Sequence, residues 1–499
     1  MPGASARSVT GPAAATPSAG TLAGDIFAVA GRTPDAPAMT GGGSADAPLT
    51  YARLTELARR AGARLDARCP DRRRPLALVA TKSAASFAVV LSCLASGRPL
   101  LLVSPDLGES TRAALVGRCG AQAVVTVADG EPVCHDAPAG GAAPATLPPG
   151  TALVLTTSGS TGVPKLVPLT GAALDAFTAW AGDAFALDGA SRVLNYAPLN
   201  FDLCLLDVWA TLRHGGCVVP VDPARAVDPA HLAAVVRRTR PHLVQAVPLF
   251  FRLLAEAAGE DSFPGVRDVV VTGDHTPRPV RARLPHLFPH ARLHNVYGCT
   301  ETNDSMMHTF TADECAGPDA LPLGRPLPGA AVAVLAGDRE VTGPGTGELI
   351  VSTPFQTPGY LADAPGDRFL QRAGRTWYRT GDLVERGPDG RLTLVGRTDF
   401  QVKVRGVRVN LEEVERVLTG HHQVAEAAVI AVPDQEAGAC LHAFVRPTTD
   451  ELTGLRLRAD CAGRLTRVAI PGRFHLVADP LPVGPTGKVD RLRLQEYLA

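Results

Sequence analysis

Short apolar runs alternate with amphipathic stretches through most of the chain. Runs that predict buried strands lie at residues 152–155, 217–221, 244–247, 268–271 and 294–296. Between them, apolar residues recur at helical spacing at residues 172–185, 229–238 and 250–258. This alternation predicts an α/β fold with layered, largely parallel sheets.

The pattern changes near residue 385. Residues 387–390 (GPDG) form a strong turn signal between two short apolar runs, which predicts a hairpin. Strand patterns then follow at 401–409 (bent at Arg405-Gly406), 427–432, 441–445 and 474–477, with helical patterns at 411–418 and 452–465. We therefore expect a large N-terminal lobe of α/β subdomains over residues 22–398 and a small α+β domain over residues 399–499.

Length and composition fit a soluble protein of several units. At roughly 150 residues per domain, 499 residues suggest about three. The formal net charge is zero, which gives no electrostatic argument for nucleic acid or an anionic membrane as partner. The most apolar stretch, residues 84–95, is too short to span a bilayer and predicts a buried helix.

Two further features bear on the cellular compartment. Residues 1–21 are rich in Ala, Pro, Ser, Gly and Thr without an apolar core, so we expect a disordered tail rather than a signal peptide. The ten cysteines have no Cys-x-x-Cys or metal-ligand spacing, which is typical of reduced thiols in a cytoplasmic protein.

Lysine is rare and concentrated in short motifs. The chain has four lysines against 45 arginines, and Lys165, Lys403 and Lys488 lie in Gly- or turn-rich segments. Lysine is a compact point charge on a flexible stem, whereas arginine is a flat fork. These three positions are therefore candidates for reaching single phosphate oxygens.

Residues 156–165 (TTSGSTGVPK) predict a phosphate-binding loop. Its glycines let backbone N–H groups turn toward an anion, and its hydroxyls and lysine add donors and charge. The nucleotide loop of kinases and ATPases does not fit, because Lys165 follows proline and no Ser or Thr follows it. A polar surface loop is the alternative. The candidate ATP-binding residues here are Thr157, Ser158, Gly159, Ser160, Thr161, Gly162 and Lys165.

The loop and four later motifs resemble the signatures of the adenylate-forming superfamily, which includes acyl-CoA synthetases and the adenylation domains of nonribosomal peptide synthesis. The later motifs are 295–301 (NVYGCTE), 378–382 (YRTGD), 396–406 (GRTDFQVKVRG) and 485–491 (PTGKVDR). The resemblance spans roughly residues 22–499. It implies a two-step reaction in which a carboxylate attacks the α-phosphate of Mg-ATP and a thiol then takes the acyl group.

The resemblance also implies roles for single residues. Lys488 would bridge the attacking carboxylate and the phosphate, Thr300 would lie beside the α-phosphate, and Glu301 would bind Mg²⁺. Further implied nucleotide contacts are Asn295 and Tyr297 to adenine, Asp382 to the ribose hydroxyls and Arg397 near ribose and phosphate. Asp399 occupies the family's hinge, about which the small domain would carry Lys488 away and bring the strand of Lys403 toward the thiol. Leu394 stands where the family often has a second aromatic residue against adenine.

Residues 200–207 (NFDLCLLD) resemble the substrate-side motif of amino-acid-activating members. Asp202 would there pair with the substrate's ammonium group, because a carboxylate in a partly desolvated pocket is costly without a cation. A helix cap at Leu203 is the alternative role for Asp202. The other expected pocket residues are Phe201, Leu203, Leu206, Leu249, Val270, Thr272, Val296, Asp304 and Ser305. They suit a small to medium amino acid, including one with a hydroxyl or a second amine, although Asp304 could equally face solvent.

These inferences predict a stand-alone enzyme that activates an amino acid with ATP and Mg²⁺. Residues 200–207 also resemble the corresponding segment of D-alanine–carrier-protein ligases. Because no carrier domain follows Lys488, we expect the acceptor to be the phosphopantetheine thiol of a separate holo acyl or peptidyl carrier protein. The alternatives are an acyl- or aryl-CoA ligase of the same superfamily and a nucleotide-binding protein that has lost its chemistry.

Overall fold

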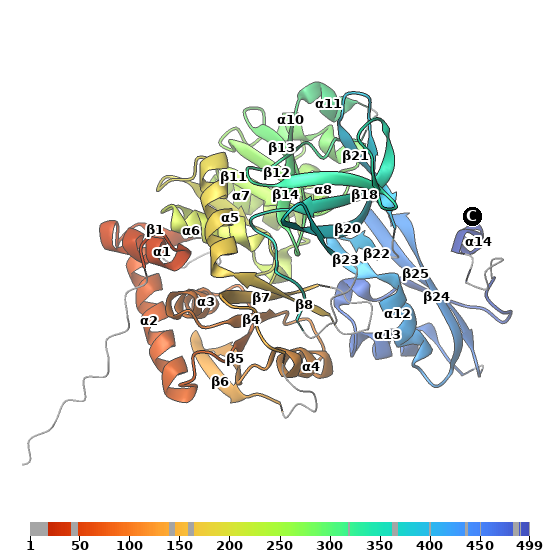
Figure 1. The fold of residues 1–499 in the computed structure, drawn as a ribbon, viewed down its shortest axis with the longest axis horizontal. Coiled ribbons are helices and arrows are strands. Elements are labelled where there is room, and N and C mark those ends of the chain that lie inside the picture. The colour runs from red at the N-terminus through yellow and green to blue at the C-terminus, as the bar shows by residue number, and fades with distance from the viewer. Residues whose placement is uncertain are drawn as a thin grey trace, which may run out of the picture.

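The computed structural model describes most of the chain (Figure 1). The described residues are 18–40, 48–138, 145–157, 164–317, 320–361, 368–398, 401–434, 438–449, 451–482, 489 and 491–498. The predicted N-terminal tail lies almost wholly outside them. No helix within these ranges is long and apolar enough to cross a membrane.

Two sheets form the body of the large lobe. The first has six strands in the order β6-β5-β3-β4-β7-β8, in which the inner pairs are parallel. Its strands are β3 (Leu76–Val79), β4 (Leu100–Val103), β5 (Ala123–Ala128), β6 (Glu131–Asp136), β7 (Thr151–Thr157) and β8 (Lys165–Thr170). The second has nine strands in the order β15-β14-β13-β12-β11-β9-β10-β1-β2. They are β1 (Pro37–Met39), β2 (Leu49–Thr50), β9 (Arg192–Asn195), β10 (Cys217–Pro220), β11 (Leu243–Ala246), β12 (Asp268–Thr272), β13 (Arg292–Cys299), β14 (Asn303–Phe310) and β15 (Arg325–Pro326).

The two faces of the nine-stranded sheet pack against different hydrophobic cores, and successive residues along a strand alternate between these cores. On β12, Val270 belongs to one hydrophobic cluster, whereas Val269 and Val271 belong to the other. Successive strand residues point to opposite faces, and a parallel sheet covered on both faces therefore reads as a continuous apolar run. The α/β layering predicted from the sequence is confirmed.

Helices cover both faces. The first cluster is shared with α1 (Leu22–Arg32), α2 (Tyr51–Arg68), α3 (Ala84–Ser96), α5 (Gly171–Ala184) and the π-helix η1 (Leu205–Ala210), which continues into α6 (Thr211–Arg213). The second includes α7 (Pro229–Thr239), α8 (Pro248–Ala258), α9 (Arg278–Arg281) and α10 (Leu284–Leu287). The predicted buried helix at 84–95 is confirmed as α3, whose Phe87 meets Trp209 of η1 edge-on at 6.2 Å. The remaining short helices of the lobe are α4 (Glu109–Cys119), η2 (Pro223–Arg225) and α11 (Ala312–Ala316).

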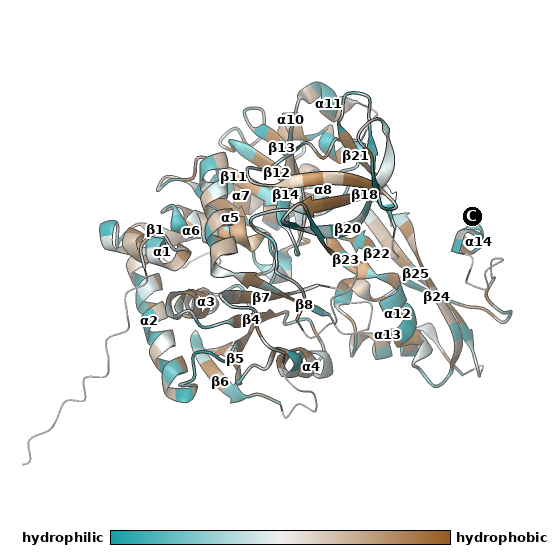
Figure 2. Ribbon diagram, viewed as in Figure 1, coloured by the Kyte–Doolittle hydropathy of each residue, from teal (hydrophilic) through white to brown (hydrophobic). Residues whose placement is uncertain are grey.

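A third, antiparallel sheet follows. Its strands are β16 (Ala331–Ala336), β17 (Arg339–Glu340), β18 (Gly345–Ser352), β19 (Phe369–Arg372), β20 (Arg375–Arg386) and β21 (Leu392–Arg397). The β20–β21 hairpin turns at the GPDG segment, as predicted. Figure 2 shows apolar colour along β4, β7 and β18 and polar turns on the outer helices α2 and α12.

The C-terminal part forms a unit with its own core. It contains a hairpin of β22 (Gln401–Val404) and β23 (Val407–Asn410), and a sheet of β24 (Val424–Asp434), β25 (Gly438–Pro447) and β26 (Arg473–Leu476). Its helices are α12 (Leu411–Thr419), α13 (Gly454–Ala462), η3 (Arg467–Ala469) and α14 (Arg491–Glu496). Helix α13 begins later than the predicted residue 452, because the Thr453 side chain caps it by accepting from the Arg456 N–H.

The β22–β23 hairpin packs against the large lobe. Its two-residue turn has positive φ at Arg405 (52°) and Gly406 (79°), the geometry of a tight hairpin turn. A Cβ at Gly406 would lie 2.3 Å from Cγ1 of Val247. A second contact joins the Thr111 hydroxyl to the Arg464 carbonyl at 3.3 Å. The hairpin therefore closes one side of the space between the two parts.

Candidate active site

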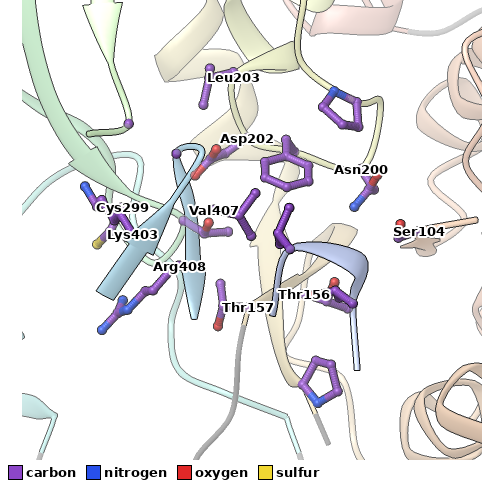
Figure 3. Close-up of a pocket in the computed structure, with 18 of the residues that line it drawn as sticks. Ser104, Thr156, Thr157, Asn200, Asp202, Leu203, Cys299, Lys403, Val407 and Arg408 are labelled. Carbon is purple, nitrogen blue, oxygen red and sulfur yellow. The ribbon is translucent and has the colours of Figure 1, made fainter. Parts of the chain in front are cut away.

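A cavity of about 270 Å³ lies between the large lobe and the C-terminal unit (Figure 3). We call it the main cavity. The large lobe contributes the end of β7, the loop before η1, the end of β12 and the β13–β14 turn, and the C-terminal unit contributes the β22–β23 hairpin and η3. Strands β12 and β13 are parallel, so their carboxyl ends open on the same side, where α/β sheets usually bind ligands.

Glu301 lies on the β13–β14 turn and is 1% exposed. One of its oxygens accepts a hydrogen bond from the Tyr360 hydroxyl at 2.6 Å, and the other is 3.4 Å from Nη1 of Arg408. Burial alone would raise the pKa of Glu301, but the Arg408 charge and the Tyr360 hydrogen bond outweigh it and hold that pKa below its ordinary value. The carboxylate is therefore ionised, and in this arrangement its charge is paired with Arg408.

Tyrosines and a lysine surround this carboxylate. The Tyr360 and Tyr378 hydroxyls are 3.0 Å apart, and burial raises the pKa of both phenols, so they remain hydrogen-bond donors. Nζ of Lys165, at the start of β8, lies 4.3 Å from the Tyr360 ring centre. The described edge of the predicted phosphate loop thus adjoins Glu301.

Asp382 lies in the middle of β20 and is bonded on both carboxylate oxygens. The Tyr297 hydroxyl donates to one and Nη1 of Arg397 to the other. Arg397 also donates to the Thr380 carbonyl at 3.0 Å. Burial, followed by the Asp382 charge, raises the pKa of Tyr297. The predicted ribose and adenine residues are therefore in direct contact.

A smaller cavity of about 50 Å³ adjoins this group. Among its lining residues are Asn295, Val296, Tyr297 and Leu394, and Lys403 lines both this cavity and the main one. The Asn295 amide is fixed by a 2.8 Å hydrogen bond to the Pro322 carbonyl. An aromatic ring, an amide and an aliphatic wall around a small cavity suit a planar heterocycle.

The hairpin links the two acidic groups. Oε1 of Gln401 accepts from Arg397 at 3.3 Å and also from Nε of Arg408. A continuous polar chain therefore runs from Asp382 through Arg397, Gln401 and Arg408 to Glu301. In this arrangement Arg397 is bonded to Asp382, which is predicted to bind the ribose, and Arg408 is paired with Glu301, which is predicted to bind Mg²⁺.

Asp202 lies in the loop before η1, and its side chain lines the main cavity (Figure 3). Burial, and then the Glu301 charge, raise the pKa of Asp202, whereas a hydrogen bond from Thr300 and the Lys403 charge oppose the rise. Phe201, Leu203, Thr272 and Asp304 line the same cavity.

Other expected pocket residues lie elsewhere. Leu206 and Val270 are fully buried in the first core, and the Ser305 hydroxyl is bonded to Thr302 at 2.9 Å. Leu249 lines a separate small cavity beside Arg405. The local reason at Leu206 is the π-helix, whose wider turns change which residues face the cavity relative to an α-helix. Lys488, Asp399 and Ser158, Gly159, Ser160, Thr161 and Gly162 are outside the described residues, so their predicted roles remain predictions.

Sequence reasoning missed Arg408 as a partner of Glu301. A signal was present, because apolar residues alternate with polar ones on β23, and Val407 and Val409 flank Arg408. The hairpin register pairs Arg408 with Lys403, so both side chains share one face.

It also missed a buried polar cluster beneath the cavity. Asp207 is fully buried and accepts from Asn195 at 3.3 Å and Gln245 at 2.9 Å. Nζ of Lys82 donates to three carbonyls nearby, and burial lowers its pKa to about 8.

Comparison with known proteins agrees with this geometry. Residues 26–361 match the AMP-binding enzyme family, and residues 413–488 match the AMP-binding enzyme C-terminal domain. The chain belongs to the AMP-binding enzyme family. Enzymes of this family use ATP. Of the residues predicted to bind nucleotide, Thr157, Thr300 and Glu301 line the main cavity, and Asn295 and Tyr297 line the smaller one.

Similar proteins include a phenyloxazoline synthase and a carrier-protein ligase. The chain is 32% identical over 487 residues, 93% of its length, to phenyloxazoline synthase MbtB of Mycobacterium sp. (strain MCS), of which it spans 41%. It is 33% identical over 346 residues, 69% of its length, to an L-proline–[L-prolyl-carrier protein] ligase of Pseudomonas fluorescens, of which it spans 68%. The chain thus spans about two fifths of the length of the phenyloxazoline synthase.

Solved structures show the same fold. PA1221, described as an NRPS protein containing adenylation and PCP domains, superposes with a TM-score of 0.81 at 25% identity, over 96% of this chain and 84% of that one. The Vibrio cholerae adenylation domain AlmE, in complex with glycyl-adenosine-5′-phosphate, gives a TM-score of 0.82 at 21% identity, over 96% and 98% of the two chains. The second likeness concerns the fold alone.

Proposed function

We propose that this AMP-binding enzyme activates an amino acid as its aminoacyl-adenylate, releases pyrophosphate, and passes the aminoacyl group to the phosphopantetheine thiol of a separate carrier protein. The observation that carries the proposal is Asp202, a carboxylate in the same cavity as Thr300 and Glu301. An ammonium group bound by Asp202 would leave the substrate's own carboxylate free to face the nucleotide.

The nucleotide would occupy both cavities. Adenine would enter the smaller cavity against Tyr297 and Asn295, and the ribose hydroxyls would bind Asp382, which as a carboxylate accepts two hydrogen bonds. Thr300 would contact the α-phosphate. The remaining phosphates would meet Thr157, Lys165 and the loop between them.

The first step joins two anions. A substrate carboxylate oxygen bonds to the α-phosphorus while the bond from that phosphorus to the bridging oxygen breaks, and pyrophosphate leaves. Catalysis of such a step depends on placement and on positive charge at the phosphate oxygens. Lys488 would supply that charge. In the second step the thiol sulfur bonds to the acyl carbon and loses its proton as AMP departs.

Glu301 is the residue that would hold Mg²⁺. Mg²⁺ usually binds one or two carboxylates together with substrate phosphates, and an ionised, buried carboxylate beside the phosphate loop fits that requirement. When bound, the ion neutralises phosphate charge. Within the described ranges no three His, Cys, Asp or Glu side chains form a separate metal cluster.

We assign the observed position of the β22–β23 hairpin to the second step, the transfer of the aminoacyl group to the thiol. The β22–β23 hairpin, with Lys403 and Gly406, lines the cavity beside Asp202 and Thr300. A pivot at Asp399 would exchange this hairpin for the segment that carries Lys488, and a few hinge residues commonly absorb such a change.

ATP–pyrophosphate exchange tests the proposal. We expect exchange with one or a few amino acids, none with fatty or aryl acids, and a loss of at least about 30-fold in Asp202→Asn, because a charge partner is removed. Loading of a holo carrier protein, followed by mass spectrometry, tests the second step. Exchange with aryl or fatty acids alone would overturn the proposal in favour of a CoA ligase, and no exchange with any acid would indicate lost chemistry.

A further inference from the structure

Besides Asp202 and Glu301, the main cavity is lined by Asp304, a carboxylate that the adenylation chemistry does not require. Asp202 comes from the loop before η1 and Asp304 from β14, and both line the cavity. Asp202 would receive the amino group that every amino acid carries. The Asp304 side chain makes no hydrogen bond or ion pair to any residue that the structure describes.

Three basic side chains near the cavity are directed to other groups, and a fourth, the exposed Arg467 of η3, lines the cavity without an ion pair to Asp304 in the described structure. The Lys403 charge acts on Asp202 and on Asp274, and Arg408 is paired with Glu301. Lys82 is held by three backbone carbonyls in the cluster below. Asp304 therefore faces the cavity without a lysine or arginine partner among the described side chains.

The charges around Asp304 are negative. Burial and the Asp202 charge raise the pKa of Asp304 to about 7, and Asp304 in turn contributes to the raised pKa of buried Asp207. Three carboxyl groups from two segments, residues 202–207 and β14, thus interact within one region. An isolated carboxylate with little water is costly, whereas a cation bound among carboxylates offsets that cost.

Two buried amides point to the same ligand chemistry. Asn200 is 5% exposed and Asn303 is 4% exposed, both line the main cavity, and the side-chain oxygen of each has no hydrogen-bond partner in the described structure. The orientation of Asn303 is fixed, because its amide nitrogen donates to the Phe355 carbonyl at 2.9 Å. Buried polar atoms are normally bonded, so acceptors without donors indicate a ligand rich in N–H groups.

We propose that the substrate is a diamino acid, whose α-ammonium binds Asp202 and whose side-chain ammonium binds Asp304. This inference rests on the proposed amino-acid activation and specifies its substrate class. Asp304 acts in it as the residue that selects the side chain.

Matched substrate pairs test the inference on the wild-type chain. Initial rates of ATP–pyrophosphate exchange are measured for 2,4-diaminobutyrate against 2-aminobutyrate, for ornithine against norvaline, and for homoserine as the neutral polar analogue. We expect kcat/KM for at least one diamino acid to exceed that of its neutral counterpart by about 30-fold or more. A preference for the neutral member of both pairs, or for homoserine, overturns the inference.

The substitution Asp304→Asn tests the residue. It keeps the shape and removes the charge, so we expect the ratio of kcat/KM for the diamino acid to that for its neutral counterpart to fall at least about 10-fold, mainly through the KM of the diamino acid. Asp338→Asn, in the exposed β16–β17 turn, is the matched control for a lost charge. Equal losses for both members of a pair would indicate a structural role and contradict the assignment.

The two proposals fail in different ways. Robust exchange with neutral amino acids and none with diamino acids removes the diamino inference and leaves amino-acid activation standing. Exchange with no amino acid at all removes amino-acid activation and the diamino inference with it.

Discussion

Two carboxylates of this AMP-binding enzyme, Glu301 and Asp304, differ in the charged groups that surround them. Glu301 is ionised although buried, because Arg408 and Tyr360 satisfy both of its oxygens. Asp304 is the opposite case, since no described cation pairs with it and its pKa rises to about 7. Glu301 thus has partners within the polypeptide, whereas Asp304 is the carboxylate for which we propose an ammonium ligand.

This contrast predicts a pH-dependent stability. Because the folded-state pKa of Asp304 lies above the ordinary value of 3.8, the folded chain binds more protons than the unfolded chain between those values, and stability falls as pH rises through about 7. The facing acidic groups, Asp202 and Asp207, also have raised pKa values and act in the same direction. Asp304→Asn should therefore raise the melting temperature of the substrate-free protein by about 2–4 °C at pH 8 and by less at pH 5.

Thermal melts of both proteins at the two pH values measure this effect. The control is Asp338→Asn, which should leave the difference between pH 5 and pH 8 unchanged. A lower melting temperature for Asp304→Asn at pH 8 would mean that the carboxylate has a stabilising partner and would contradict the prediction.

Residue-level sequence reasoning grouped residues whose positions follow from local patterns. Asp202 lies 98 residues before Thr300 and 99 before Glu301, and all three line one cavity because loops at strand ends meet there. Leu206, Val270 and Ser305 do not line it. The position of Leu206 depends on the π-helix at Leu205–Ala210, and the Ser305 hydroxyl is bonded to Thr302. Neither feature produces a hydrophobic periodicity that can be recognised in the sequence.

At the scale of elements, the β22–β23 hairpin carries most of the C-terminal contribution to the site. The bend at Arg405-Gly406 was predicted from the sequence and is confirmed as a two-residue turn. The partner of that turn could not be predicted, because the contact with Val247 joins segments 159 residues apart. Similarly, only the folded chain brings Arg408 to Glu301.

Gly406→Ala should separate the two half-reactions. The added methyl would lie 2.3 Å from Cγ1 of Val247, and φ of 79° disfavours any side chain. Since the clash exists in the arrangement that we assign to thiol transfer, carrier loading should fall by at least about 10-fold, which corresponds to 1.4 kcal/mol, while pyrophosphate exchange changes little. Single-turnover loading and equilibrium exchange measure the two rates.

The double variant Gly406→Ala, Val247→Ala provides the control. Removing the valine methyls should restore part of the loading rate, because the steric conflict is relieved and only the backbone strain remains. An equal fall in both half-reactions, with no recovery in the double variant, would contradict the role of this contact.

At the scale of the whole molecule, two parts with separate cores share one cavity. The C-terminal core includes Val414, Ala443 and Leu457 and none of the large-lobe residues. The contacts between the parts are local, such as Thr111 with Arg464 and Arg408 with Glu301. Large movements between such parts are expected when the interface is limited.

Mg-ATP should loosen this arrangement. A nucleotide with its metal would compete with Arg408 for Glu301 and with Arg397 for Asp382, which removes two links of the polar chain. We expect hydrogen–deuterium exchange to increase at segments 108–112 and 463–466 when Mg-ATP is added, and to change less with ATP and EDTA. Unchanged exchange under both conditions would show that the nucleotide binds without moving the C-terminal unit.

The separate cores also bear on how such an enzyme diversifies. Both carboxylates that we assign to the substrate, Asp202 and Asp304, belong to the large lobe, whereas the C-terminal unit contributes Lys403 and Arg408 to the cavity. Mutations at the two carboxylates therefore need not disturb the folding of the C-terminal unit. A lineage could exchange one building block for another by drift around a single loop and a single strand, and inherit its machinery for delivery unaltered.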